Sequence, residues 1–220
     1  MNGQWEFGSV NTRSIKLIQA LTLKVPFCGR AEESRHVCGF FTKGEDMFLE
    51  LMKKRRSIKE YEDRAVEQEK IDMIIESALR APSGRAARPW HFVVVTDKGL
   101  LEKLSIAKPD GAAFLKNAPV GIVICGDPDN SRVWVEDCSI AAVIMQLAAQ
   151  SLGLGSRWTH MRGNNYDDSK SSRDYIAELL GLPENLDVQC IIAIGYPAEE
   201  MGPYKKEDLH FNKVSYNRYE

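Results

Sequence analysis

Apolar residues along the chain switch between helical and strand-like spacing. From Ile71 to Leu79 they recur every three or four positions, which predicts an amphipathic helix that ends before Pro82. The same criterion predicts further helices over residues 47–56, 100–104, 133–152 and 175–180. Asp46 is expected to cap the first of these helices. Helix 133–152 carries apolar residues on most of its sides, so we expect it to be buried nearly all round.

Four short runs predict strands, and all of them except residues 157–162 are rich in valine or isoleucine. They span residues 90–96, 120–125, 157–162 and 188–194. Because helices and strands alternate along the chain, the pattern indicates an α/β or α+β fold, with one sheet covered by helices on both faces.

The two ends of the chain differ from its middle. Residues 1–46 hold glycines, scattered charges and one apolar run without a repeating partner, so we expect a poorly ordered leader, or a start codon placed too far upstream, before a domain of residues 47–220. The polar C-terminal segment keeps large apolar residues that have no periodic partner. We expect them to pack on another subunit; they are Leu209, Phe211, Val214, Tyr216 and Tyr219.

Charge and cysteine content narrow the class of protein. The 220 residues carry 29 basic and 31 acidic side chains, so no net field attracts nucleic acid or anionic lipid. No apolar stretch is long enough to span a bilayer and no signal peptide is evident, which favours the cytoplasm. The five cysteines form no Cys-x-x-Cys pair, so we interpret them as small buried residues in a reducing compartment. Cys28 and Cys38 could pair only in an oxidising one.

Four short segments could carry chemistry. They are the basic run Lys53–Lys59, the loop Ala81–Phe92, the turn Gly153–His160, and Gly195–Pro197 followed by Lys205 and Lys206. Arginine forks and a serine hydroxyl bind phosphate oxygens, and a Pro-Ser-Gly loop lets backbone approach a flat ligand. Each segment alone also fits an ordinary role, as a solvated helix end, a connection or a turn.

The order and spacing of these segments are more specific than any one of them. Arg-Arg-Ser-x-Lys, then Ala-Pro-Ser, Arg-Pro-Trp-x-Phe, Gly-Leu-Gly-x-x-Trp and Ile-Gly-Tyr-Pro, make residues 47–220 resemble the FMN-dependent nitroreductase family. The resemblance implies an α+β sandwich with a mixed central sheet, assembled as an intertwined homodimer. It also implies that FMN binds at each of two subunit interfaces.

The resemblance assigns roles to individual residues. Arg55, Arg56 and Ser57 would hold the FMN phosphate and ribityl chain, and Lys205 or Lys206 would add charge from the tail. Lys59 would lie along the pyrimidine edge of the flavin, where a cation stabilises the negative charge of the reduced ring. Three residues of the partner chain would pack on the ring, namely Pro82, Ser83 and Gly84. The backbone of Trp158, Thr159 and His160 would face the flavin N5 edge.

Two positions depart from the family pattern. Ala86 and Arg88 stand where the family commonly has Asn and Gln, so a flavin contact is lost or is replaced by Arg85 or Arg88. An extra arginine there favours an anionic substrate or a nicotinamide phosphate, or is a plain surface residue; the sequence leaves both open. The four histidines show no metal-binding spacing, and no metal is expected.

The resemblance implies a homodimeric FMN oxidoreductase. NAD(P)H would reduce the flavin, and a nitroaromatic, quinone or activated alkene would then take the electrons in a ping-pong cycle. The alternatives are a reductive dehalogenase, a flavin-consuming synthase, or a non-catalytic flavin-binding or storage protein. The connection Gly126–Arg132 is short and leaves little room for the substrate lid of the first two.

Overall fold

The computed structural model describes residues 39–219, with side chains from residue 47 onward. The chain divides into a unit of residues 1–43 and a unit of residues 44–220. The expected leader lies largely outside the described residues, and its role stays a prediction. Helix α2 spans Gly39–Lys54, so Asp46 lies inside the helix. The expectation that Asp46 caps this helix was wrong, because the helical backbone already begins at Gly39.

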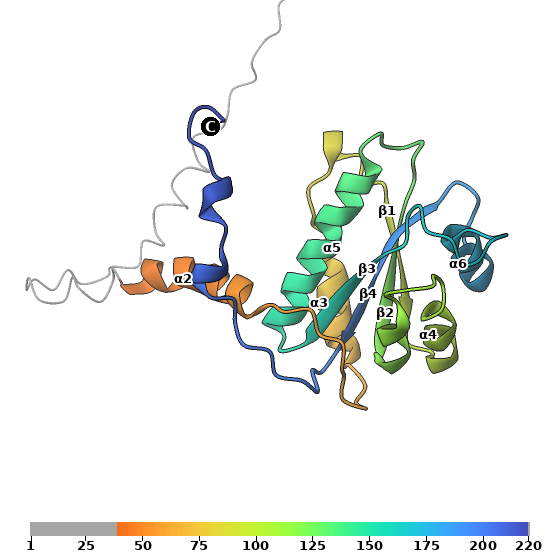
Figure 1. Cartoon of the computed structure of the whole chain (residues 1–220), viewed down its shortest axis with the longest axis horizontal. Helices are drawn as coiled ribbons and strands as arrows, with labels where there is room; N and C mark the ends of the chain where they lie inside the picture. Colours follow the sequence, from red (N-terminus) through yellow and green to blue (C-terminus); the bar gives the residue numbers. More distant parts are fainter. Residues whose placement is uncertain (1–38, 220) are drawn as a thin grey trace, which may run out of the picture. The chain divides into compact units, whose positions relative to one another are not determined.

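A four-stranded sheet forms the centre of the described chain (Figure 1). Its strands are β1 (Trp90–Val95), β2 (Val120–Gly126), β3 (Gly155–His160) and β4 (Asp187–Gly195), in the spatial order β1-β2-β4-β3. All three pairings are antiparallel. β3 starts earlier and ends earlier than predicted, because Gly155 already pairs with Gly195 whereas the amides of Met161 and Arg162 both bond to the Gln189 carbonyl.

The sheet within one chain is therefore purely antiparallel, and the expectation of a mixed sheet was wrong. Strands β2 and β3 do run in the same direction, as the strand–helix–strand order around α5 (Trp134–Ser151) suggests. Strand β4 lies between them and is antiparallel to both, so the two parallel strands never pair. The one parallel pairing in the described chain is an isolated bridge between Ser57 and Ser156.

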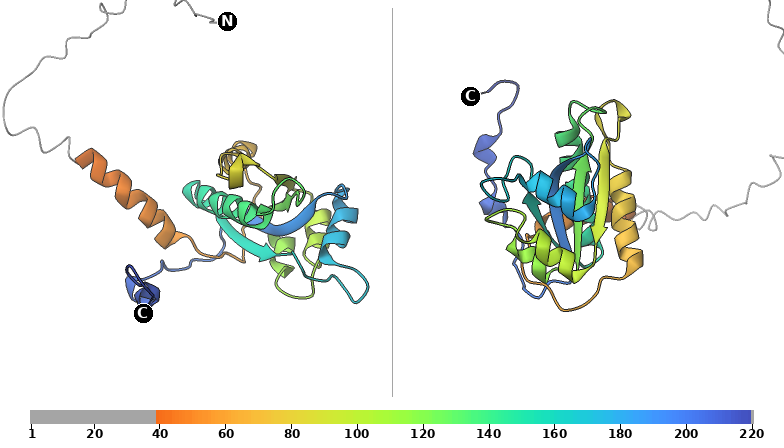
Figure 2. Two further views of the ribbon diagram at one scale, coloured as in Figure 1. Left: turned by 90° about the horizontal axis from the view of Figure 1, so that it is seen from above. Right: turned by 90° about the vertical axis from the view of Figure 1, so that its right-hand side faces the viewer.

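Helices cover both faces of the sheet, as predicted (Figure 2). On one face α3 (Gln68–Leu79) and α5 pack on residues such as Ile122 and Ile192. On the other face lie α4 (Lys98–Leu104), the short helix η3 (Ala113–Asn117) and α6 (Ser172–Leu180). The side chains of β2 alternate between the two clusters, so both faces are apolar.

Helix α5 is less buried than its composition suggests. Met145 and Ala149 on its inner side are fully buried, but Val133, just before the helix, and Ile140 and Val143 on it are each about two-fifths exposed. The last two lie one helical turn apart on one side of α5. The prediction that α5 is buried on nearly all of its sides was therefore wrong for a single chain. The side of α5 that carries Ile140 and Val143 is an exposed apolar stripe.

The burial predicted for the cysteines is confirmed for the three that the structure describes. Cys125, Cys138 and Cys190 are buried and unpaired. Burial raises the pKa of the Cys125 and Cys138 thiols to about 12, so both stay protonated and unreactive at neutral pH. Cys28 and Cys38 lie outside the described residues. Among the described helices none is both long and apolar enough to cross a membrane.

The core under α4 gives a direct test of this packing. Leu104 is fully buried on the sheet face that α4 covers. Leu104→Ala should lower the free energy of unfolding by about 2–5 kcal/mol, because it removes buried methyl groups and leaves a cavity. Urea unfolding measures the loss. Lys103→Ala, at an exposed position of the same helix, should change it by less than about 0.5 kcal/mol. Similar losses for both variants would contradict the packing.

Candidate functional site

The basic segment after α2 lies along the outer edge of β3. The Ile58 amide donates to the Ser156 carbonyl at 3.1 Å, and Ser57 pairs with Ser156 in the parallel bridge. Gly155 makes this approach possible, because a Cβ there would lie 2.7 Å from the Ile58 side chain. The Tyr61 hydroxyl donates to the Ile58 carbonyl at 2.8 Å and fixes the segment further. The sequence motif is thus held as extended backbone, and Arg55, Ser57 and Lys59 flank that contact.

The predicted phosphate ligands are not equivalent. The Arg56 guanidinium donates to the Gly202 carbonyl and lies 4.3 Å from the centre of the Tyr204 ring, so it holds the C-terminal segment. The Arg55 side chain is half-buried and makes no hydrogen bond or ion pair within the described residues. The Ser57 residue is exposed and its hydroxyl makes no bond there either. Arg55 and Ser57 therefore offer open donors next to the β3 edge.

The C-terminal segment runs back along the same residues. The Glu62 amide donates to the Tyr196 carbonyl at 2.9 Å, and the Ala198 amide donates to the Glu60 carbonyl at 3.0 Å. Further on, the Tyr204 amide donates to the Lys53 carbonyl at 3.0 Å. Lys205 and Lys206 follow directly and are exposed. Within the described chain no bond joins their side chains to Arg55 or Ser57, so their predicted role at the phosphate stays a prediction.

Glu199 joins the two segments and was missed by the sequence reasoning. Its carboxylate accepts the Lys59 amide at 2.6 Å and the Glu60 amide at 3.3 Å. The bond from the Lys59 amide is the main cause that lowers the pKa of Glu199, and the charges of Lys59 and Arg157 lower it further. Glu199 is therefore an anion that positions the backbone of Lys59. No sequence motif marks it, because its partners are backbone amides about 140 residues earlier.

Strand β3 lies within Gly153–His160, the third of the four segments that the sequence analysis singled out. Trp158 is two-fifths exposed and its ring lies 5.5 Å from that of His160, whereas Thr159 is buried. The Lys108 ammonium donates to the His160 carbonyl at 2.8 Å, and the Thr159 hydroxyl donates to the Gly111 carbonyl at 3.0 Å. Burial lowers the pKa of Lys108. The loop that holds Lys108 thus supports the end of β3, and the sequence analysis did not single it out.

The Pro-Ser-Gly loop is clamped by a buried carboxylate. Asp137, in the first turn of α5, is almost fully buried and accepts the Gly84 amide at 2.8 Å and the Ser131 hydroxyl at 3.1 Å. The Arg88 amide donates to the Ser83 hydroxyl at 2.9 Å. The Ser83 hydroxyl thus accepts a bond from within its own loop, and Pro82 remains exposed.

Three residues of this loop adopt left-handed backbone. Their φ angles are 53° for Arg85, 57° for Ala86 and 49° for Arg88. None is glycine, so each conformation costs about 1–2 kcal/mol. Strain of this kind persists only where surrounding contacts enforce it, and it clusters at ligand-binding sites.

The two halves of the predicted site lie far apart in one chain. The Pro82–Arg88 loop packs against the first turn of α5 and leads into β1, one edge of the sheet. The Arg55–Lys59 segment packs against Gly155, beyond the last turn of α5 and on β3, the opposite edge. The 18 residues of α5 span about 27 Å. One chain therefore brings Arg55–Lys59 together with Trp158–His160, but not with Pro82–Arg88.

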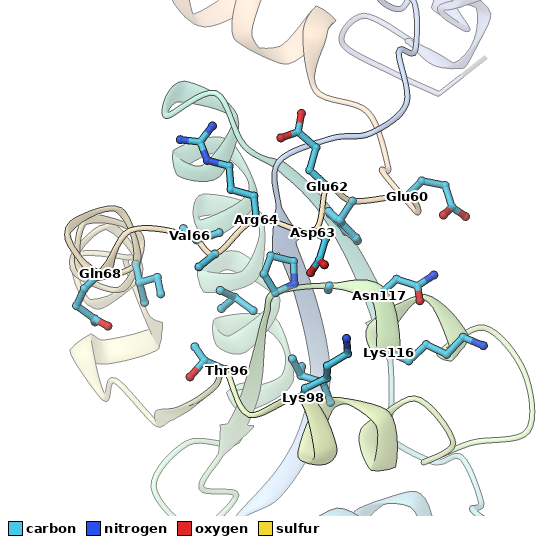
Figure 3. A pocket seen from close by; sticks show the side chains of 17 residues that line it. Glu60, Glu62, Asp63, Arg64, Val66, Gln68, Thr96, Lys98, Lys116 and Asn117 are labelled. Atoms are coloured by element: carbon cyan, nitrogen blue, oxygen red, sulfur yellow. The ribbon is translucent and has the colours of Figure 1, made fainter.

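The structure also contains a cavity of about 650 Å³ (Figure 3). The loop Glu60–Val66, the start of α4 and the segment Lys116–Val120 line it. It contains none of the predicted site residues. In the described part of the chain no cluster of three or more His, Cys, Asp or Glu side chains could hold a metal ion.

Comparison with known proteins places this geometry in a family. Residues 52–108 and 106–196 match the model of the Nitroreductase family. A Methanothermobacter thermautotrophicus protein, named provisionally as an NADH dehydrogenase/NAD(P)H nitroreductase, is 39% identical over 184 residues, which are 81% of this chain and 92% of that protein. The human iodotyrosine deiodinase 1 is 42% identical over 192 residues, with 72% and 64% coverage.

Solved structures agree with the sequence comparison. An FMN-dependent nitroreductase from Clostridium difficile superposes with a TM-score of 0.76 at 48% identity, covering 77% of this chain and 98% of that one. The resemblance noted from the motifs is confirmed, and the chain belongs to the nitroreductase family of oxidoreductases.

A charged cluster at the base of α3 yields a pH-dependent prediction. The Glu67 carboxylate accepts the Tyr196 hydroxyl at 2.6 Å and pairs with Arg64 at 2.9 Å. These contacts, the first above all, lower the pKa of Glu67 from 4.5 to about 2. As the pH falls, the Glu67 carboxylate therefore takes up its proton at a higher pH in the unfolded chain than in the folded protein. The stabilisation that Glu67 contributes is complete above pH 4.5 and is lost as the pH falls toward 2.

Glu67→Gln isolates this contribution because glutamine does not titrate. Wild type should be more stable than the variant at pH 6, and the difference between their urea midpoints should shrink between pH 4.5 and pH 2. A difference that stays constant over this range would show that Glu67 titrates normally in the folded protein.

Proposed function

We propose that the protein is a homodimeric FMN-dependent oxidoreductase in which each active site is built from two chains. The observation that carries the proposal is the separation of the two motif groups along α5. Both groups are intact, yet one chain cannot place them on one ligand. A second copy supplies the missing loop, as the family resemblance implies.

The residues beside β3 fit a flavin phosphate and ribityl chain. Arg55 and Ser57 hold open donors at the end of α2, and a guanidinium with a hydroxyl suits phosphate oxygens. Arg56 acts through its bond to Gly202, which keeps the tail, and with it Lys205 and Lys206, close to this segment. The relative from Clostridium difficile is named FMN-dependent, which supports this choice of cofactor.

The residues around Lys59 fit the ring of the flavin. Glu199 fixes the Lys59 backbone, and the exposed Lys59 ammonium would lie along the pyrimidine edge of bound FMN. The backbone of Trp158, Thr159 and His160 would face the flavin N5 edge, and Lys108 supports this stretch through its bond to the His160 carbonyl. Pro82, Ser83 and Gly84 of the second copy cover the ring, with Ala86 and Arg88 close by. Bound FMN supplies hydride chemistry, taking a hydride from NAD(P)H and passing the electrons to an acceptor.

Two uncovered apolar surfaces support the dimer. Ile140 and Val143 form the exposed stripe of α5. In the tail, Leu209, Phe211 and Val214 are each more than half exposed, as are Tyr216 and Tyr219. Burying one large apolar side chain contributes roughly 1.5–3 kcal/mol of free energy. A second copy that covers both surfaces would therefore stabilise a dimer substantially.

The acceptor is a nitroaromatic, a quinone or an activated alkene. Reductive dehalogenation is a second candidate, favoured by the likeness to proteins named iodotyrosine deiodinase. The seven residues between β2 and α5 speak against a large substrate lid at that position. A panel with nitrofurazone, menadione, 2-cyclohexenone and an iodophenol separates these four classes of acceptor.

Flavin binding and reduction form the central test. The purified protein should be yellow with about one FMN per chain, and NADPH under argon should bleach it within seconds. Arg55→Ala combined with Ser57→Ala should yield folded, colourless protein, since the phosphate loses its charge-assisted bonds. Lys54→Ala, which removes a neighbouring exposed charge, should keep the flavin. A double variant that retains full flavin would sink the assignment of this motif, and flavin that NADPH leaves oxidised would support a storage protein.

The tail is tested by truncation after Met201. This removes Gly202 and Tyr204, which hold Arg56, together with the exposed apolar residues that follow. The truncated chain should be monomeric or aggregated by light scattering and should lack flavin. A soluble, yellow, dimeric or monomeric truncation would contradict the role of the tail.

A further inference from the structure

A single carboxylate is buried in the described part of the chain, that of Asp137. It lies in the first turn of α5 and is 2% exposed. Both of its hydrogen-bond donors are neutral, namely the Gly84 amide at 2.8 Å and the Ser131 hydroxyl at 3.1 Å. Taking a carboxylate out of water without a cationic partner costs free energy, which the amides at a helix N-terminus offset only in part. We therefore expect Asp137 to have a role beyond packing.

The bond from the Gly84 amide fixes the loop where its backbone is most strained. The two residues directly after Gly84, Arg85 and Ala86, both adopt left-handed backbone. Gly84 itself is pressed against the residue before α5, because a Cβ at this position would lie 2.7 Å from the Val133 side chain. Without the bond to Asp137 the loop would be free to relax, since left-handed backbone is unfavourable for residues other than glycine. Asp137 thus sets the position of Pro82–Gly84 relative to α5.

Asp137 is remote from the phosphate-binding segment proposed for its own chain. It lies in the first turn of α5, whereas Arg55–Lys59 packs against Gly155, beyond the last turn. Any effect of Asp137 on a flavin therefore passes through the Pro-Ser-Gly loop. The proposed function places this loop on the flavin that the second copy binds.

We propose that Asp137 is a positioning residue that acts in trans, holding Pro82–Gly84 in place for the flavin bound by the other subunit. This rests on the proposed function, in which these three residues cover the flavin ring. Asp137 does not touch the flavin and acts only through the Gly84 amide. A loop that is already held in its binding position loses less freedom when the flavin binds, so both flavin affinity and reduction by NADPH depend on Asp137.

Two substitutions separate the hydrogen bond of Asp137 from its charge. Asp137→Ala removes the acceptor of the Gly84 amide and should weaken FMN binding at least about 10-fold, the range for a lost charge-assisted bond. Asp137→Asn keeps the shape, because its amide oxygen still accepts from Gly84 and its amide nitrogen donates to Ser131; it should bind FMN within about 3-fold of wild type. Asp129→Ala removes an exposed acid from the segment before α5 and should bind FMN as wild type does.

Titration of the apoproteins with FMN, followed by flavin fluorescence, measures these affinities. Unchanged binding in Asp137→Ala would overturn the proposal. So would an equal loss in Asp137→Ala and Asp137→Asn, because the Gly84 bond would then not be the cause.

Mixed dimers test whether Asp137 acts on the other subunit. One chain carries Arg55→Ala with Ser57→Ala, the other carries Asp137→Ala, and two different affinity tags isolate the mixed species. One of its sites combines both defects, whereas the other joins an intact phosphate segment to an intact loop. The mixed dimer should therefore bind one FMN with wild-type affinity, and NADPH should bleach that flavin at the wild-type rate, although neither parent homodimer does so.

A mixed dimer without such a site would overturn the proposal, because Asp137 would then act within its own chain or on stability alone. A wild-type pair that carries the same two tags tests the proposed function separately and should bind two FMN per dimer. If the wild-type pair binds FMN and the mixed dimer does not, only the role of Asp137 fails. If the wild-type pair binds no FMN or is not a dimer, the proposed function fails and the role of Asp137 fails with it.

Discussion

The length of α5 is the constraint on which the proposed site depends. Met145 and Ala149 seat the helix in the core, and the two motif groups pack near opposite ends of its length of about 27 Å. The first turn positions the Pro-Ser-Gly loop through Asp137, and the turn after the helix positions Gly155 against Ile58. A rigid helix of this length cannot bend to bring the two together. The proposed site therefore forms only when the start of one α5 lies near the end of another.

The C-terminal segment links assembly to the same site. Arg56 binds Gly202 and stacks on Tyr204, while Glu199 holds the Lys59 backbone. One segment thus orders the residues proposed for the cofactor and continues into the exposed apolar tail. Anything that stabilises the tail, such as a second copy, also stabilises the backbone around Lys59. By the same linkage, a cofactor that binds at Arg55 and Lys59, as proposed, would favour the ordered tail.

Features with local causes could be predicted from the sequence. The helix at Ile71–Leu79 and the strands around Ile122 and Ile192 follow from spacing, and both faces are covered as expected. The mixed sheet was wrong because the position of β4 is set by long-range packing. The prediction that α5 is fully buried was wrong, because the apolar content of a helix does not say which chain covers its surface. Glu199 and Lys108 bond to backbone groups distant in sequence, so no local pattern marks them.

The strained loop shows how a departure from the family motif is accommodated. Arg85, Ala86 and Arg88 all take left-handed backbone, where asparagine is tolerated better than alanine. Ala86 therefore has no local reason to adopt this conformation, and the contacts around it must enforce it. The buried Asp137 does so through the Gly84 amide, and Asn130 does so through the Ala87 carbonyl. Because these clamps come from the start of α5 and the segment before it, the same helix that separates the two halves of the site also sets the shape of one half.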